Sequence, residues 1–67
     1  MTKAEYREYF AECKPFIKFK YFLKKCNIPE SSFSKFMQDD LFDYQISLNK
    51  LNQLYNLLNE TIYGIIA

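Results

Sequence analysis

The sequence contains no histidine and only one glycine, Gly64, and each shortage excludes a kind of chemistry. Histidine is the side chain that most often transfers protons near neutral pH, and the cysteines of this chain lack it as an activating base. A single glycine cannot form a glycine-rich phosphate-binding loop. We therefore expect a protein that is not an enzyme, binds no cofactor and acts on no small-molecule substrate.

Metal-binding patterns are also missing from the sequence. Cys13 and Cys26 are the only cysteines, and two thiols without a histidine cannot complete a zinc site. Asp39, Asp40 and Asp43 lie close together, but the glycine and the closing glutamate of a calcium loop are absent. The sequence therefore predicts no metal site.

Long apolar runs and leader patterns are absent as well. No run approaches the ~20 apolar residues that cross a bilayer, and no signal-peptide pattern precedes the first helix. A length of 67 residues is enough for one domain. We expect a single domain over residues 1–67 that is soluble, cytoplasmic and not attached to a membrane.

Aromatic residues are abundant, and the charge is unevenly divided along the chain. Seven Phe and six Tyr accompany a hydrophobic fraction of 49%, which favours a dense core in so short a chain. The net charge is +1, but residues 1–25 hold seven Lys or Arg and three Glu, whereas residues 26–67 hold two Lys and five acidic residues. The basic half is typical either of a phosphate-binding surface or of a solvated helix face.

Caps and prolines predict the first three helices. A capping box at residues 2–5 begins a helix that ends near Cys13. Pro15 suits the first turn of a second helix, which we expect to continue to about Lys25. A third helix is predicted over residues 29–37, again with a proline in its first turn.

The rest of the chain is predicted to form a loop and a fourth helix. Residues 38–46 carry acidic and apolar side chains and are predicted as the loop. Ser47 is a good N-cap, and apolar residues follow it in steps of three and four through Ile62. Gly64 is expected to turn the chain out of this helix into a short strand or arm. The expected fold class is all-α, a compact domain of four or five helices.

The segment 19–38 has the apolar spacing of two short helices joined by a tight turn. Its first part repeats apolar residues at i, i+3, i+4 and i+7, which are Phe19, Phe22, Leu23 and Cys26. Asn27 stands where the chain must turn, and asparagine tolerates positive φ. We expect Ile28 to fill the turn, and Phe33 and Phe36 to form the inner face of the second helix. The other face of that helix then projects into solvent.

The runs Asn-Ile-Pro at 27–29 and Phe-Ser at 33–34 resemble the helix-turn-helix of Cro/repressor-type (XRE-like) DNA-binding domains. Residues 47–58 look like the fourth helix of that family, and the resemblance covers about two-thirds of the chain. Leu23 stands where the family commonly has alanine, and Phe19 where it often has glutamine. The resemblance implies a small, sequence-specific, repressor-like transcriptional regulator of a phage or mobile genetic element. Its partners would be double-stranded DNA and a second copy of the chain.

The resemblance also implies which residues contact DNA. The residues at matching base-reading positions are Glu30, Ser31, Ser32, Lys35 and Gln38. The residues expected to contact phosphate are Lys18, Lys20, Lys24 and Ser47. The apolar residues near the C-terminus are expected either to mediate dimerisation or to fold back on the first helix. These residues are Ile62, Tyr63, Ile65 and Ile66.

A second interpretation makes the chain a protein-binding module, such as an inhibitor or antirepressor on a helix-turn-helix scaffold. It is favoured by the near-neutral net charge, because DNA-binding domains are usually more basic. It is also favoured by the acidic residues of segment 38–46 and by the tyrosines expected to be exposed. Those tyrosines are Tyr9, Tyr21 and Tyr44.

Overall fold

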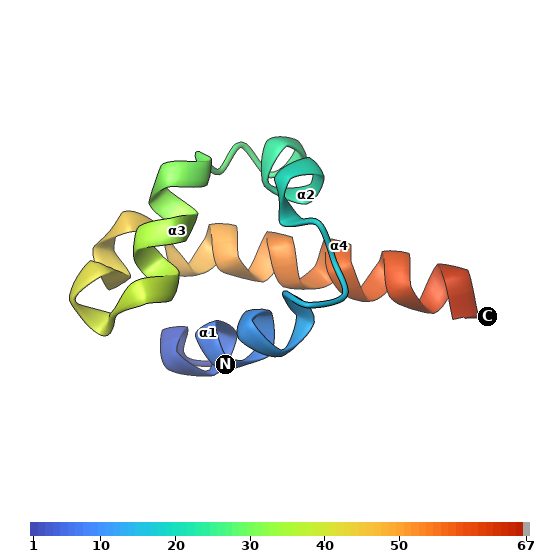
Figure 1. The fold of residues 1–67 in the computed structure, drawn as a ribbon, viewed down its shortest axis with the longest axis horizontal. Helices are drawn as coiled ribbons and strands as arrows, with labels where there is room; N and C mark the ends of the chain where they lie inside the picture. The colour runs from blue at the N-terminus through green and yellow to red at the C-terminus, as the bar shows by residue number, and fades with distance from the viewer. Residues whose placement is uncertain (67) are drawn as a thin grey trace.

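The computed structural model describes the backbone of residues 1–66 and the side chains of residues 1–61. Over that range the chain forms four α-helices and one 3-10 helix, and no strand. The elements are α1 (Lys3–Cys13), α2 (Phe19–Lys25), α3 (Glu30–Gln38), η1 (Asp40–Gln45) and α4 (Leu48–Ile66). Figure 1 shows α4 along the length of the molecule, with α1 on one side of it and α2 and α3 on the other. The all-α class is confirmed.

Helix α1 begins as predicted, with a reciprocal capping box. The Glu5 backbone N–H donates to the Thr2 hydroxyl at 3.2 Å, and the Thr2 N–H donates to the Glu5 carboxylate at 2.8 Å. Both interactions satisfy amides that the first turn of a helix leaves without partners. The boundaries of α1 agree with those expected from the sequence.

The predicted start of α2 at Pro15 is wrong, because α2 begins at Phe19. Residues 14–16 form a turn in which the N–H groups of Phe16 and Ile17 donate to the Cys13 carbonyl, at 2.9 and 3.0 Å. The proline therefore closes α1 rather than opening α2. Helix α3 also starts one residue later than predicted, since Pro29 (φ −62°, ψ 138°) is extended and precedes the helix.

The predicted loop 38–46 is largely helical. Residues Asp40–Gln45 form η1, and the Asp39 carboxylate accepts a hydrogen bond from the Leu41 N–H at 3.3 Å. An Asp side chain that caps a short turn in this way stabilises it locally. This element brings the number of helices over residues 1–66 to five, the larger of the two numbers expected.

Helix α4 begins as predicted and ends differently. The Ser47 hydroxyl accepts from the Lys50 N–H at 3.3 Å, which confirms the N-cap. The helix then runs through Gly64 to Ile66, so the short C-terminal strand or arm is not formed over residues 1–66. A formed helix gains one hydrogen bond for each added residue, which offsets the roughly 1 kcal/mol that a glycine costs. The side chains of the proposed dimerisation residues Ile62, Tyr63, Ile65 and Ile66 lie outside the described residues.

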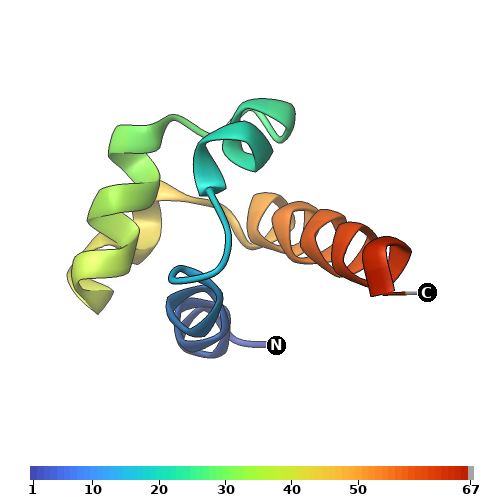
Figure 2. The ribbon, with the colours of Figure 1, turned by 45° about the vertical axis from the view of Figure 1, so that its right-hand side comes forward.

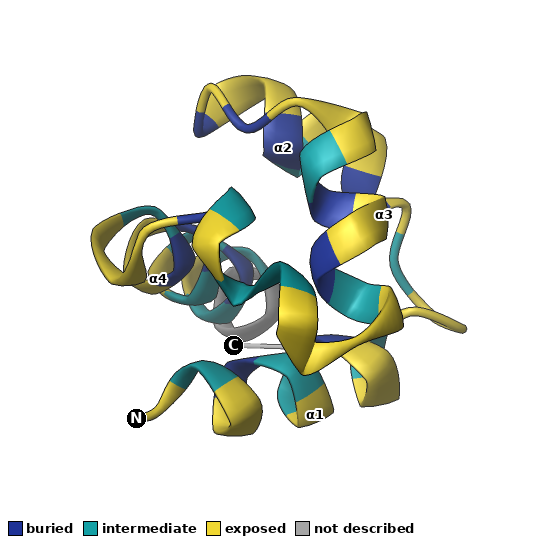
Figure 3. Cartoon of the chain, turned by 90° about the vertical axis from the view of Figure 1, so that its left-hand side faces the viewer, coloured by how far each residue is buried: buried dark blue, intermediate teal, exposed yellow. Residues whose placement is uncertain are grey.

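The core is an aromatic cluster packed on the leucines of α4. Rings of Phe10, Phe19 and Phe33 lie 5.0 to 6.0 Å apart, centre to centre. Figure 3 shows buried positions on the inward faces of all four α-helices. The side chains that are entirely buried are Phe10, Phe36, Leu51, Leu54 and Leu58. Both departures from the family pattern, Phe19 and Leu23, lie in this core.

Two tyrosines join α1 to α4 through asparagines. The Tyr6 hydroxyl donates to Asn52 at 3.0 Å, and the Tyr9 hydroxyl donates to Asn59 at 2.9 Å. Tyr9 is therefore half-buried against the core, and the expectation that it is exposed is wrong.

No helix among the described residues is both long enough and apolar enough to cross a membrane.

Candidate nucleic-acid interface

The turn between α2 and α3 has the backbone geometry that the sequence predicts. Asn27 has a φ of 57°, in the left-handed region. The Asn27 N–H donates to the Lys24 carbonyl at 3.2 Å and the Ile28 N–H donates to the Leu23 carbonyl at 2.9 Å. This pair of bonds is a Schellman motif, and the burial of both Leu23 and Ile28 supplies the apolar contact that accompanies it. The angle between α2 and α3 is therefore set by backbone bonds and by packing together.

Helix α4 also supports this turn. The Lys50 ammonium donates to the Cys26 carbonyl at 3.0 Å, so a side chain from the first turn of α4 satisfies the C-terminal end of α2. Cys26 is buried, and burial raises the pKa of its thiol. The charge of the nearby Lys50 lowers this pKa, but to a smaller extent. A neutral thiol in this position packs as a small apolar side chain, as expected from the sequence.

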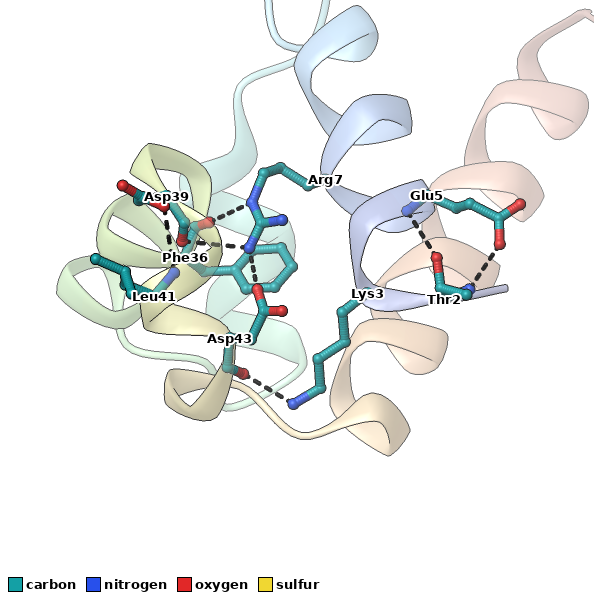
Figure 4. A network of polar contacts seen from close by, with 8 residues as sticks. All are labelled: Thr2, Lys3, Glu5, Arg7, Phe36, Asp39, Leu41 and Asp43. Carbon is teal, nitrogen blue, oxygen red and sulfur yellow. Dashed lines mark hydrogen bonds and ion pairs between the residues drawn. The ribbon is translucent and has the colours of Figure 1, made fainter.

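Arg7, on α1, holds the other end of α3 (Figure 4). Its Nε donates to the Phe36 carbonyl at 2.7 Å and its Nη2 donates to the Asp39 carbonyl at 3.3 Å. The guanidinium also pairs with the Asp43 carboxylate, and its carbon lies 4.5 Å from the centre of the Phe36 ring. Lys3 adds a hydrogen bond to the Asp43 carbonyl at 2.8 Å. These contacts join α1, α3 and η1 in one polar network.

Sequence reasoning missed Arg7. The available signal was that it is the one arginine of the chain, beside eight lysines. Among the basic side chains, only a guanidinium has several N–H donors in one plane, so that it can bind two carbonyls and a carboxylate at once. Helix α3 is thus fixed at its N-terminal end by the turn and at its C-terminal end by Arg7.

The acidic residues after α3 do not converge on one point. Asp43 pairs with Arg7, and Asp39 caps η1. A hydrogen bond with the Asp40 carboxyl, together with the Leu41 N–H, lowers the pKa of Asp39, and the same interaction raises the pKa of Asp40. Among the described residues, no three His, Cys, Asp or Glu side chains are grouped as metal ligands are.

Helix α3 turns a polar row toward solvent. Ser31, Ser34, Lys35 and Gln38 follow at i, i+3, i+4 and i+7 and are all exposed, while Phe33 and Phe36 are buried. Ser31, Lys35 and Gln38 were predicted to contact DNA, and Ser34 was missed. Helical spacing was the signal that would have found it. Ser32 is half-buried and lies off this row.

A groove of about 390 Å³ separates α2 from α3. Its floor includes Phe19 and Phe33, and its polar rim consists of Lys14, Lys20, Glu30 and Ser34. Glu30 and Lys20, predicted as a base contact and a phosphate contact, therefore line the same groove. Lys14 joins them there and was not among the predicted residues.

The other predicted phosphate contacts lie elsewhere. Lys18 lines a different groove beside the C-terminal half of α4, and Lys24 is exposed on the outer face of α2. Ser47 is exposed at the start of α4, where its hydroxyl oxygen already accepts from Lys50. The structure thus brings the predicted DNA contacts together only in part.

The basic side chains divide into engaged and free groups. Lys3, Arg7 and Lys50 bind inside the domain, and the Lys25 ammonium lies 4.9 Å from the centre of the Tyr21 ring. Over residues 1–61, five lysines have no hydrogen bond, no ion pair and no ring contact. They are Lys14, Lys18, Lys20, Lys24 and Lys35, and all lie between the end of α1 and α3. Of these five, Lys14 and Lys20 line the groove between α2 and α3, and Lys35 lies on α3.

Comparison with protein-family models, curated proteins and solved structures finds no match for this chain.

Proposed function

We propose that the chain is a small, sequence-specific DNA-binding regulator that uses α2, its turn and α3 as a helix-turn-helix. The observation that carries the proposal is the polar row on α3, which is exposed while the opposite face of the helix is buried and both helix ends are fixed. A rigid helix with a polar outer face is the element that reads base edges in the major groove. Ser31, Ser34, Lys35 and Gln38 are the proposed base-reading residues.

The free lysines support the same proposal. A net charge of +1 understates the charge of the first half of the chain, because residues 1–25 hold seven Lys or Arg and only three Glu. Lys14 and Lys20 line the groove between α2 and α3, and Lys24 is exposed on α2, so phosphates flanking α3 could contact the first two directly. Contacts of this kind fix the orientation of a protein on the duplex and make its affinity depend on salt.

A homodimer on a palindromic site follows from the size of the domain. One such module buries roughly 600–1,000 Å² on DNA, which is little for high specificity. Two copies placed about 34 Å apart along one face of the duplex would double the contacts. We propose a repressor-like role in the control of a phage or mobile element, in keeping with the family resemblance.

The test is selection of bound sites from a pool of random double-stranded DNA at near-physiological salt. The expected result is an enriched palindrome, with half-sites separated by one helical turn. Selection with a variant carrying Lys35→Ala should relax the preference at one position of each half-site. An unenriched pool, at protein concentrations that saturate non-specific DNA, would contradict the proposal.

A second candidate function is a protein-binding inhibitor or antirepressor, and η1 is the observation that favours it. Leu41 and Tyr44 are 75% and 73% exposed, and the acidic Asp39 and Asp40 lie beside them in the sequence. An apolar patch edged by acidic groups suits a basic, amphipathic partner surface. If this interpretation is correct, Tyr44→Ser should release a co-purifying protein, whereas Lys35→Ala should not.

A further inference from the structure

Lys50 stands at a position of α4 where local helix preferences favour a different side chain. Ser47 caps the helix, and its hydroxyl accepts from the Lys50 N–H at 3.3 Å, so Lys50 is the third residue of the first turn. A capping box has Glu or Gln at that position, and a positive charge near the N-terminal end of a helix is unfavourable. Helix α1 follows the preference, because Glu5 holds the same position there and accepts from the Thr2 N–H at 2.8 Å. The lysine is therefore unfavourable for α4 itself.

The side chain of Lys50 is engaged outside its own helix. Its ammonium donates to the Cys26 carbonyl at 3.0 Å, and the residue is half-buried. Cys26 directly follows the last residue of α2, and the carbonyls at such a helix end lack partners within the helix and carry partial negative charge. The charge that is unfavourable at the start of α4 is thus favourable at the end of α2.

The carbonyl that Lys50 binds lies directly before the turn that leads into α3. Asn27 follows with a φ of 57°, the Ile28 N–H donates to the Leu23 carbonyl at 2.9 Å, and α3 begins at Glu30. Figures 1 and 2 both show the first turns of α4 below the segment that joins α2 to α3. Because α3 starts so soon after this turn, a change in the backbone angles of the turn would redirect the whole helix.

We propose that Lys50 is a positioning residue, which holds the α2–α3 turn in the conformation that presents the polar row of α3 to DNA. The inference rests on the proposed DNA binding and adds a residue that itself touches neither a base nor a phosphate. Other polar residues of α4 serve a different contact, since Asn52 and Asn59 accept from tyrosines of α1. A residue that breaks a local preference and is compensated by a distant contact is typical of a specific tertiary role.

Lys50→Gln separates positioning from general stability. Glutamine completes a capping box with Ser47, which offsets the lost bond to Cys26, so the melting temperature should stay within about 5 °C of wild type. The Ile28 amide should nevertheless exchange with solvent about fivefold faster, as loss of one hydrogen bond at the turn predicts. The Tyr6 amide, which donates within α1, should exchange as in wild type. Lys50→Arg keeps a charged donor and should restore wild-type exchange.

The DNA measurement compares Lys50→Gln with Lys24→Gln, because each variant removes one lysine charge. Lys50→Gln should lower the ratio of affinities for the selected palindrome and for random DNA at least about tenfold, since α3 is no longer held in one orientation. Its salt slope on random DNA should equal that of wild type. Lys24→Gln is the matched control, with a slope about one unit flatter and an unchanged ratio.

Several results would overturn the proposal. One is unchanged exchange of the Ile28 amide in Lys50→Gln, and another is an unchanged affinity ratio in this variant when wild type selects a site. A flatter salt slope for Lys50→Gln would mean that the lysine contacts phosphate, and a large fall in its melting temperature would mean that the contact is generally stabilising. A wild type that selects no site contradicts the proposed function, and exchange of the Ile28 amide then decides alone whether Lys50 holds the turn.

Discussion

Replacement of Arg7 is the sharpest test of how the fold is held together. Arg7→Ala removes two hydrogen bonds to backbone carbonyls, an ion pair and a ring contact in a single change. The Arg7 side chain is only 17% exposed, so these interactions are shielded from solvent to a large extent. The Phe36 and Asp39 carbonyls would both lose this donor.

The magnitude can be worked from these contacts. A hydrogen bond from a charged group contributes about 1.5–3 kcal/mol, and the bond of 3.3 Å to Asp39 belongs at the low end. The ring contact adds about 0.5–1 kcal/mol. Because the contacts are not additive, we expect a loss of about 2–4 kcal/mol. A domain of this size has about 3–10 kcal/mol in total, so the melting temperature should fall by about 10–25 °C.

The assay is urea unfolding and thermal melting followed by circular dichroism, with Asp43→Asn as the matched variant. Asp43→Asn removes the ion pair but leaves both carbonyl contacts of Arg7 and the Lys3 contact to the Asp43 carbonyl. Since the Asp43 side chain is 38% exposed, this change should cost about 1 kcal/mol or less, and added salt should reduce the loss. Equal losses for Arg7→Ala and Asp43→Asn would refute the reasoning, because the carbonyl contacts would then contribute nothing.

Four other changes have defined outcomes. Phe33→Ala should cost about 3–5 kcal/mol in urea unfolding, and a melting temperature within a few degrees of wild type would show that the α3 register is wrong. Asn27→Ala should lose about 1 kcal/mol whereas Asn27→Gly should lose none, because φ is 57° there, and equal melting of the two would exclude backbone strain. Hydrogen bonds with Thr2 lower the pKa of Glu5 in the folded protein. The ionised Glu5 therefore stabilises the fold at pH values above the Glu5 pKa of the unfolded chain, and this stabilisation is lost as the pH falls through the Glu5 pKa of the folded protein. A Glu5→Gln variant should accordingly lose less stability in acid than wild type does. On DNA, Lys24→Ala should weaken all sequences alike and flatten the salt slope by about one unit, unlike Lys35→Ala, which should act at one base position.

Local patterns in the sequence determined the helical class and the inner faces of the helices. The capping box of α1, the Ser47 cap of α4 and the positive φ of Asn27 involve residues within a few positions of each other, so propensity and spacing suffice to predict them. Burial of Phe33 and Phe36 was predicted for the same reason, because helical periodicity assigns residues to a face without knowledge of the partner helix.

Only the tertiary structure decided which polar groups are engaged. Arg7 reaches carbonyls 29 and 32 residues away, and Lys50 reaches one 24 residues away, and no local spacing encodes such pairs. Those contacts in turn decide which lysines stay free, and so where the positive surface lies. The same holds for Pro15, whose local preference suits a helix start but which closes α1 instead, because the chain must turn there to lay α2 against the core. Local preferences amount to about 1 kcal/mol each, and packing contacts between distant residues exceed them.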